Sequence, residues 1–335
     1  MDTQSTGLSG SENGIGRSRV FDTVDDGPPI ERSVVLSGWL ERQRFHPLLA
    51  AFLMFVLTFV LFQGIASIVA LSIIVAQQGA TDPAGLIAML ESATGALLVG
   101  NTVGQFVGMA IPVILLTALH TKQSGAFLRI GKPDPALLGL SVFALAGLLP
   151  VIQWLGEINA SLPIPDFLTE LEAAQLELIE RILSGDIWIG STIFALAITP
   201  ALCEELLFRG YLQRQFERSF GIVGGIVTTG VLFGLYHFRL SQAIPLAVLG
   251  IFLGWLAWRT GSLWVPVMIH FVNNGIAIMA ASLAAANPEW GIENLENLPV
   301  PWPVVLGGAF LLAGAILLMN RRVVSSDASR IDHLS

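Results

Sequence analysis

Residues 187–209 read IWIGSTIFALAITPALCEELLFR, an apolar stretch that ends with two glutamates and an arginine. The stretch is long enough for a helix that crosses a bilayer, which needs about 20 residues. A charge at the centre of the bilayer costs roughly 2.5–3.5 kcal/mol on insertion scales, so ionisable residues inside a span are candidates for a functional site. Glu204, Glu205 and Arg209 should therefore have partners elsewhere in the chain.

The composition of the chain is that of an integral membrane protein. Of its 335 residues, 53% are hydrophobic and only 13% are charged, whereas an average soluble domain is about 25% charged. The mean hydropathy is +0.71. The net charge of −8 leaves no basic surface for nucleic acid. The single cysteine, Cys203, excludes an internal disulfide and a multi-cysteine metal site.

Apolar segments of the length that a membrane helix needs recur along the chain. They predict an all-α, polytopic bundle of about eight transmembrane helices, over residues 47–76, 95–119, 135–156, 187–209, 221–238, 243–259, 262–284 and 303–320. Residues 1–45 are polar and rich in Gly, Ser and Asp, which is typical of a disordered tail. Residues 166–185 carry acidic residues between regularly spaced apolar ones, which predicts an amphipathic helix at the membrane interface.

The basic residues indicate the orientation of the spans, because cytoplasmic loops of membrane proteins are enriched in Lys and Arg. With the N-terminus in the cytoplasm and eight spans, all but Arg181 and Arg239 of the 17 basic residues lie on the cytoplasmic side. We therefore expect a multi-pass protein of the cell membrane, surrounded by lipid, with its N- and C-termini in the cytoplasm.

Ionisable and polar residues cluster in the fourth, fifth and seventh predicted spans. In the fifth span, Phe233 and His237 are four residues apart, and in the seventh, His270 and Asn274 are four residues apart. Residues at this spacing share one face of a helix. Each pair should therefore point in one direction.

The two glutamates of the fourth span should differ in their surroundings. Adjacent residues of a helix point about 100° apart. Glu205 shares a face with Arg209, four residues later, and can pair with it. Glu204 is then left for another partner.

The fourth and fifth spans are expected to form a hairpin that turns near residues 219–221. Glu204 and His237 lie at nearly equal distances along the chain from this turn, so the two antiparallel arms should bring them side by side. Small residues four apart would let the fifth span approach a neighbouring helix closely, at Gly221, Gly225, Gly230 and Gly234.

Together the three spans supply a carboxylate, two histidines and a carboxamide. Burial disfavours the charged form of a carboxylate and makes it a better general base, so a carboxylate and a histidine can activate water. A second histidine and an asparagine can donate hydrogen bonds to an oxyanion, which completes the groups needed for amide hydrolysis. Alternatively, Glu204, His237 and His270 could bind Zn²⁺ and leave one position for water. The H-E-x-x-H motif of soluble zinc proteases is absent.

Three motifs in this order carry a resemblance to a known family. EELLFR fits E-E-x-x-x-R, FGLYH fits F-x-x-x-H and HFVNN fits H-x-x-x-N, all within residues 187–284. On consecutive late spans they resemble the CAAX protease and bacteriocin-processing (CPBP) family of intramembrane endopeptidases. This family is also called Abi proteins or type II CAAX prenyl endopeptidases.

The resemblance implies a role for each matching residue. Glu204 would be the base, assisted by His237, while His270 and Asn274 stabilise the oxyanion. Glu205 and Arg209 would support them. The family has been described both as metalloproteases and as metal-free glutamate proteases, so a zinc cofactor and a metal-free mechanism are both open.

The resemblance also divides the chain into regions. We expect a catalytic core at 187–284, preceded by transmembrane helices and the amphipathic helix at 46–186. A last transmembrane helix and a short cytoplasmic tail follow at 285–335. The substrate would be a membrane protein or a membrane-associated peptide cut near its C-terminus, and the oligomeric state is left open.

Two other classes of function compete with a peptidase. A transporter would bind its substrate with polar residues at mid-membrane, but it predicts internal repeats that the sequence lacks. A non-catalytic membrane scaffold, as in bacteriocin immunity, would have no need for Glu204.

Several other residues are expected to be structural. Phe233 should pack against the ring of His237, and Cys203 should act as a small buried hydrophobe. The remaining histidines lie at span ends or in the C-terminal tail, and we expect them to be solvated: His46, His120 and His333.

Overall fold

The computed structural model describes residues 34–78, 93–184, 187–290 and 299–332. Most of the tail for which we expect disorder, and His333, lie outside these residues. The described part of the tail is ordered, because Val34 and Leu36 are buried in the core and a short helix, α1, follows them.

The described residues form helices and their connections, without strands. In chain order, the helices are α1 (Trp39–Arg42), α2 (Pro47–Gln78), α4 (Thr94–Gln105), η1 (Phe106–Ala110), α5 (Ile111–Thr117), α6 (Ser124–Phe127), α7 (Pro135–Ala160), α8 (Asp166–Ser184), α9 (Ile189–Ile193), η2 (Phe194–Ile198), α10 (Thr199–Glu205), η3 (Leu206–Leu212), α11 (Gln213–Tyr236), η4 (Leu240–Gln242), α12 (Ala243–Thr260), α13 (Trp264–Ala286), η5 (Pro288–Trp290) and α15 (Trp302–Asp332). Three of them, η1, η2 and η3, are π-helical segments that continue an α-helix on both sides.

Seven helical segments of the described chain are long and apolar enough to cross a membrane. One of them, Ile189–Tyr236, has 48 residues and contains Gly221, whose φ of 74° is not helical. The chain reverses there, and the two arms then lie against each other. A Cβ atom on Gly225 would lie only 2.7 Å from the backbone nitrogen of Glu217. The segment is therefore two helices joined by the predicted hairpin, and the bundle has the expected eight crossings.

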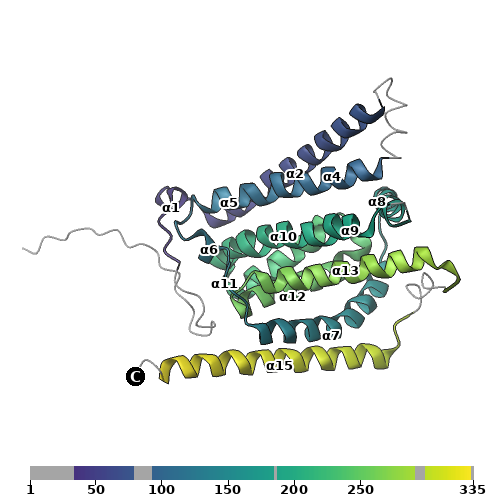
Figure 1. The fold of residues 1–335 in the computed structure, drawn as a ribbon. Helices are drawn as coiled ribbons and strands as arrows, with labels where there is room; N and C mark the ends of the chain where they lie inside the picture. Colours follow the sequence, from purple (N-terminus) through teal and green to yellow (C-terminus); the bar gives the residue numbers. More distant parts are fainter. Residues whose placement is uncertain (1–33, 79–92, 185–186, 291–298, 333–335) are drawn as a thin grey trace, which may run out of the picture.

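The bundle places the fourth, fifth and seventh spans at its centre. Figure 1 shows α2 and α4 along one side and α7 and α15 along the other, with α9, α10, α11, α12 and α13 between them. The amphipathic helix α8 runs across one end of the bundle, and α1 lies at the opposite end. The helices with the three motifs are thus shielded by helix pairs on both sides.

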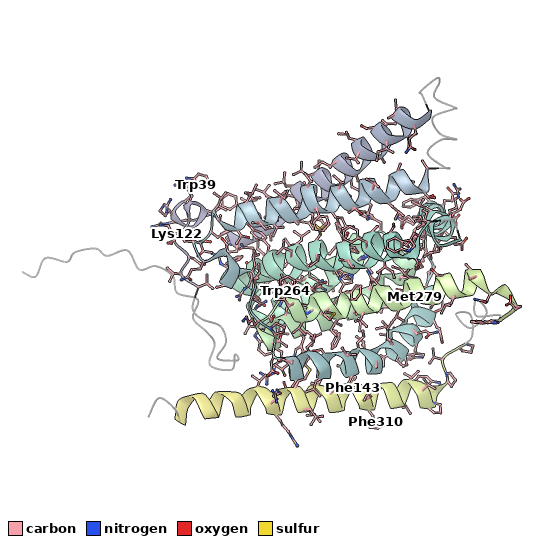
Figure 2. The ribbon with its side chains drawn as sticks, in the orientation of Figure 1. Trp39, Lys122, Phe143, Trp264, Met279 and Phe310 are labelled. Atoms are coloured by element: carbon pink, nitrogen blue, oxygen red, sulfur yellow. The ribbon has the colours of Figure 1, made fainter. Side chains whose placement is uncertain are left out.

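The outer surface of the bundle is apolar. Large hydrophobic side chains are exposed on outer helices, among them Phe143 on α7 and Phe310 on α15, which are 62% and 76% exposed (Figure 2). Such extended apolar patches are rare on soluble monomers and are typical of a surface that meets lipid. The protein is a multi-pass membrane protein.

Glycines bring α11 and α12 into backbone contact. A Cβ atom on Gly230 would lie 2.6 Å from the backbone nitrogen of Ile251, and one on Gly250 would lie 2.8 Å from the carbonyl oxygen of Gly230. Gly234 is equally close to the backbone of Ala247. The predicted close approach of the fifth span is confirmed, and it exposes the carbonyl of Gly250 to the centre of the bundle.

A polar network holds α1 against the core. Nδ1 of His120 lies 2.7 Å from Oε1 of Glu41, and Nε2 lies 2.8 Å from the hydroxyl of Tyr211. Arg218 donates to Oε2 of Glu41 at 2.7 Å. The expectation that His120 is solvated is wrong, since it is only 1% exposed. His46 is exposed, as expected.

Candidate active site

Glu205 is the centre of a buried charged cluster. Its Oε1 accepts hydrogen bonds from Nη1 of Arg209 at 2.7 Å and from Nδ1 of His270 at 2.8 Å. Arg209 also donates from Nη2 to the carbonyl of Gly250 at 3.0 Å. Glu205 and Arg209 have no exposed surface. The predicted Glu205–Arg209 pair is confirmed, and His270 from the seventh span joins it.

An interruption of the fourth span connects it to Asn274. Pro200 has no backbone N–H and cannot bond to the carbonyl four residues earlier, which is that of Leu196. The π-helix η2 ends immediately before α10, the segment that contains this proline. Nδ2 of Asn274 donates to the Leu196 carbonyl at 3.2 Å, and Nδ2 of Asn101 donates to that of Ala195 at 3.3 Å. Single π-helical turns are frequent at functional sites.

The ring of Phe233 is the point where all three motifs meet. Its centroid lies 4.8 Å from that of His237 and 5.7 Å from that of His270, both edge to face. The guanidinium carbon of Arg209 lies 4.4 Å from the same centroid, which is a cation–π contact. The expected packing of Phe233 on His237 is confirmed, and the phenyl ring also contacts His270.

The hydrogen bonds of His237 fix which of its nitrogens is free. Nδ1 lies 2.8 Å from the backbone carbonyl oxygen of Phe233, at the end of α11. A carbonyl only accepts, so Nδ1 carries the hydrogen. In the neutral ring, Nε2 then has a free lone pair and is an acceptor. His237 is partly exposed, which leaves this nitrogen within reach of water.

Glu204 differs from its neighbour in having neither an ion pair nor a hydrogen bond to a described residue, whereas Glu205 is held through its Oε1. The residue is 8% exposed, and its Oε2 has no hydrogen-bond partner among the described residues. Buried polar atoms are normally hydrogen-bonded, and exceptions often have a functional reason. The chain thus holds one carboxylate in an ion-pair cluster, Glu205, and beside it a second one, Glu204, outside that cluster.

The spacing of the donor side chains bears on metal binding. Among the residues that the structure describes, no three His, Cys, Asp or Glu side chains lie close enough together to hold a metal ion. Glu204, His237 and His270 therefore do not fit a zinc site in this arrangement.

Tyr236, directly before His237, also lies near the candidate site, although the sequence motifs do not predict it. Its ring contacts that of Phe208 edge to face, with the two centroids 5.3 Å apart. Its side chain also interacts electrostatically with Glu204. Tyr236 is buried and its hydroxyl has no partner among the described residues. The sequence offered one indication of its role. The chain has only two tyrosines, and this one directly precedes a motif histidine.

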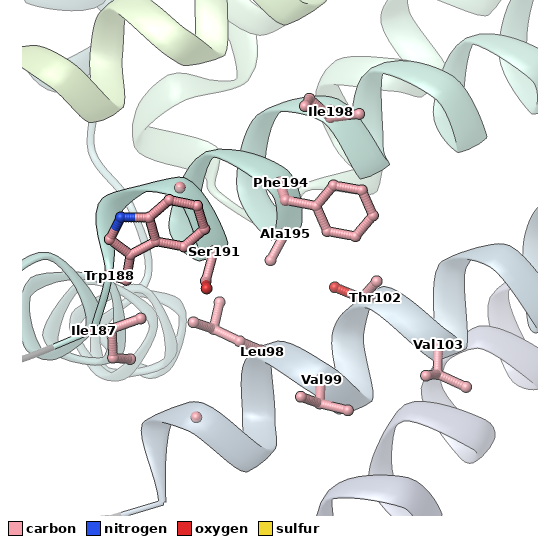
Figure 3. A pocket seen from close by; sticks show the side chains of 12 residues that line it. Leu98, Val99, Thr102, Val103, Ile187, Trp188, Ser191, Phe194, Ala195 and Ile198 are labelled. Carbon is pink, nitrogen blue, oxygen red and sulfur yellow. The ribbon is translucent and has the colours of Figure 1, made fainter.

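An apolar cavity of about 710 Å³ lies beside η2. One wall is α4, with Leu98 and Thr102, and the other is formed by Trp188, Ser191 and Phe194 (Figure 3). Ala195, whose carbonyl Asn101 binds, lines this second wall, and Asn274 binds the carbonyl of the next residue, Leu196. The cavity and the polar site thus share η2 as a common element.

Comparisons with known proteins agree with the membrane fold and the three motifs. Residues 186–276 match the family model "Type II CAAX prenyl endopeptidase Rce1-like". The chain is also 24% identical over 208 residues to the protein named "Putative membrane peptidase YdiL" of Bacillus subtilis (strain 168). That match covers 62% of this chain and 79% of the relative. No solved structure matches the chain.

The matched segment runs from the start of the fourth span into the seventh, and it contains every motif residue. The fold and the comparisons define the class of the protein, a multi-pass membrane peptidase. Within this class, residues 186–276 are similar to the Rce1-like type II CAAX prenyl endopeptidases.

Proposed function

We propose that the protein is an intramembrane endopeptidase in which Glu204 is the general base. The observation that carries the proposal is the contrast between adjacent carboxylates. Glu205 accepts hydrogen bonds from Arg209 and His270 through its Oε1, whereas Glu204 accepts none from the described residues and its Oε2 is buried. A carboxylate in low dielectric with a free acceptor is suited to take a proton from water.

His237 assists Glu204 in activating the water. Because Nδ1 of His237 is bound to a backbone carbonyl, Nε2 points its lone pair away from the helix and accepts a hydrogen bond from the same water. The water oxygen attacks the carbonyl carbon of the scissile peptide bond while one of its protons moves to Glu204. The negative charge then develops on the carbonyl oxygen.

His270 and Asn274 stabilise this oxyanion. The hydrogen bond from Nδ1 of His270 to Glu205 orients the imidazole, and a hydrogen on Nε2 is then directed at the oxyanion. Asn274 uses one amide hydrogen for the Leu196 carbonyl and has a second one for the substrate. Protonated Glu204 finally returns its proton to the leaving nitrogen as the carbon–nitrogen bond breaks.

The substrate that fits this site is a peptide with an apolar part. The cavity between α4 and η2 is lined mainly by hydrocarbon side chains, next to the element that Asn274 binds. It has room for the apolar portion of a membrane protein or membrane-associated peptide. The family description names CAAX prenyl endopeptidases, so cleavage near a C-terminus is the specific form of the proposal.

The substitution Glu204→Gln tests the base. It preserves shape and removes the proton acceptor, and general base catalysis contributes roughly 10²–10⁴-fold to the rate. We expect cleavage of an internally quenched, C-terminal membrane peptide by purified protein to fall by at least that lower factor. The matched control is Glu157→Gln on α7, whose carboxylate accepts a hydrogen bond from the backbone of Val300. Turnover of the Glu204→Gln variant near that of the wild type would contradict the proposal.

The same preparation separates the two mechanisms considered for the family. About one equivalent of zinc, lost in the His237→Ala and His270→Ala variants, would support a zinc-dependent reaction. Full activity of protein free of metal would support the glutamate mechanism described above.

A further inference from the structure

Tyr236 has a fixed position beside the candidate base. Its ring contacts three phenylalanines. Its centroid lies 5.8 Å from that of Phe55 and 6.0 Å from that of Phe59, both on α2, and 5.3 Å from that of Phe208 on η3. All three contacts are edge to face. Because they come from α2 and η3, the phenol is held by two different helices. Phe208 follows Glu204 by four residues, and the ring contact therefore sets Tyr236 against the part of the helix that carries Glu204.

Three buried oxygens in this region lack hydrogen-bond partners among the described residues: the hydroxyl of Tyr236, Oε2 of Glu204 and Oε2 of Glu205. The first two concern the water, because the Glu205 carboxylate is already held through its Oε1 by Arg209 and His270. Tyr236 also lies within electrostatic range of Glu204 and its ring centroid is 6.2 Å from that of His237. Buried polar atoms of this kind are commonly satisfied by a water molecule with two to four polar partners.

We infer that the hydroxyl of Tyr236 is a third partner of the attacking water, together with Glu204 and His237. This inference rests on the proposed peptidase function. The water donates one hydrogen to Glu204 and the other to Nε2 of His237. It accepts the hydrogen of the Tyr236 hydroxyl with one lone pair, which leaves the second lone pair for the peptide carbonyl.

This arrangement gives the tyrosine a role in catalysis without proton transfer. As the oxygen–carbon bond forms, the water proton moves to Glu204, and Tyr236 keeps its own hydrogen throughout. Its hydrogen bond removes rotational freedom from the water, so that the attacking lone pair is aimed before the substrate binds. The chain then has a tyrosine, a glutamate and a histidine around one water.

The substitution Tyr236→Phe tests the inference because it retains the ring and its three aromatic contacts. Loss of one hydrogen bond to the reacting water should lower kcat about tenfold. KM should stay within about twofold, because the peptide itself makes no contact with the hydroxyl. The melting temperature should be unchanged or higher, since a buried hydroxyl without a protein partner is removed.

Tyr211→Phe is the matched control, because Tyr211 is the only other tyrosine of the chain. Its hydroxyl is bound to Nε2 of His120 in the network that holds α1. Its removal should lower the melting temperature and leave kcat unchanged. An unchanged kcat in Tyr236→Phe, or equal losses of kcat in both variants, would overturn the inference.

A second measurement is independent of peptidase activity. If Tyr236 and Glu204 share a water, the effect of Tyr236→Phe on the melting temperature should differ between the wild type and the Glu204→Gln background. Strictly additive shifts would overturn the inference even if the protein cleaves peptides. Coupled shifts in a protein that cleaves no peptide would support the shared water and reject the proposed function.

Discussion

At the scale of single residues, the site depends on the different environments of Glu204 and Glu205. They are neighbours in one helix, yet Glu205 is held by Arg209 and His270, whereas Glu204 has no hydrogen-bond partner among the described residues. The helical spacing of Glu205 and Arg209 was enough to predict their pairing. The position of His270 was not, because it is 65 residues away from Glu205 in the chain and arrives there through packing of α13.

Glu205→Gln should destabilise the protein far more than a similar change at the surface. It leaves Arg209 buried without its counter-charge, and breaking a buried pair in this way typically costs about 3–5 kcal/mol. We expect a marked fall in melting temperature together with lower activity.

Glu177→Gln is the control for this prediction. Glu177 and Arg181 on α8 have the same spacing of four residues, but both side chains are solvent-accessible. Exposed pairs of this type are worth only about 0.3–0.5 kcal/mol. Equal melting temperatures for the two variants would show that the Glu205–Arg209 pair does not stabilise the core.

At the scale of helices, α1 is joined to the bundle by Glu41. Burial alone would raise the pKa of the Glu41 carboxyl, but the hydrogen bonds and charges of His120 and Arg218 outweigh it and hold the pKa below its usual 4.5. A carboxyl whose pKa is lower in the folded state stabilises that state above the unfolded pKa. This stabilisation is lost as the pH falls below about 4.5 and through the folded pKa.

The expected result is a pH-dependent difference between the wild type and Glu41→Gln. At neutral pH the wild type should melt at a higher temperature, and the difference should shrink as the pH is lowered below about 4.5. Thermal unfolding in detergent across this range measures it. A difference that stays constant with pH would mean that the ionised carboxylate does not hold α1.

At the scale of the whole molecule, the structure separates the two ends of the bundle. Figure 1 places α1 and the C-terminal end of α15 at one end and α8 at the other. Lys122 lies near α1 at the first end (Figure 2). Arg239 lies within electrostatic range of Glu172 on α8, at the second end. We propose that the first end faces the cytoplasm, where basic residues are enriched.

Reporter fusions test this topology. A fusion at residue 335 should score as cytoplasmic, and one near residue 290, after α13, should score as external. A fusion after residue 120 should match the one at residue 335, because α5 ends on the side of the bundle where α1 and the C-terminal end of α15 lie. The opposite pattern would reverse the orientation and place the hairpin of α10 and α11 on the outer side.

The sequence by itself determined the helices, the hairpin and the identity of the motif residues. These features can be identified without knowledge of the packing, because they are local: the length of apolar segments, the spacing of four residues and the glycine at the turn. Residues 187–284 therefore predicted which spans would meet, and the ring of Phe233 shows that they do.

Only the tertiary structure decided which partner each polar atom has. His270 on Glu205, Asn274 on the carbonyl released by Pro200, and His120 between Glu41 and Tyr211 are all contacts between distant segments. Periodicity assigns a side chain to a face, but which distant group meets that face is set by the packing of several helices at once. For the same reason, the placement of Tyr236 beside Glu204 became visible only in the folded bundle.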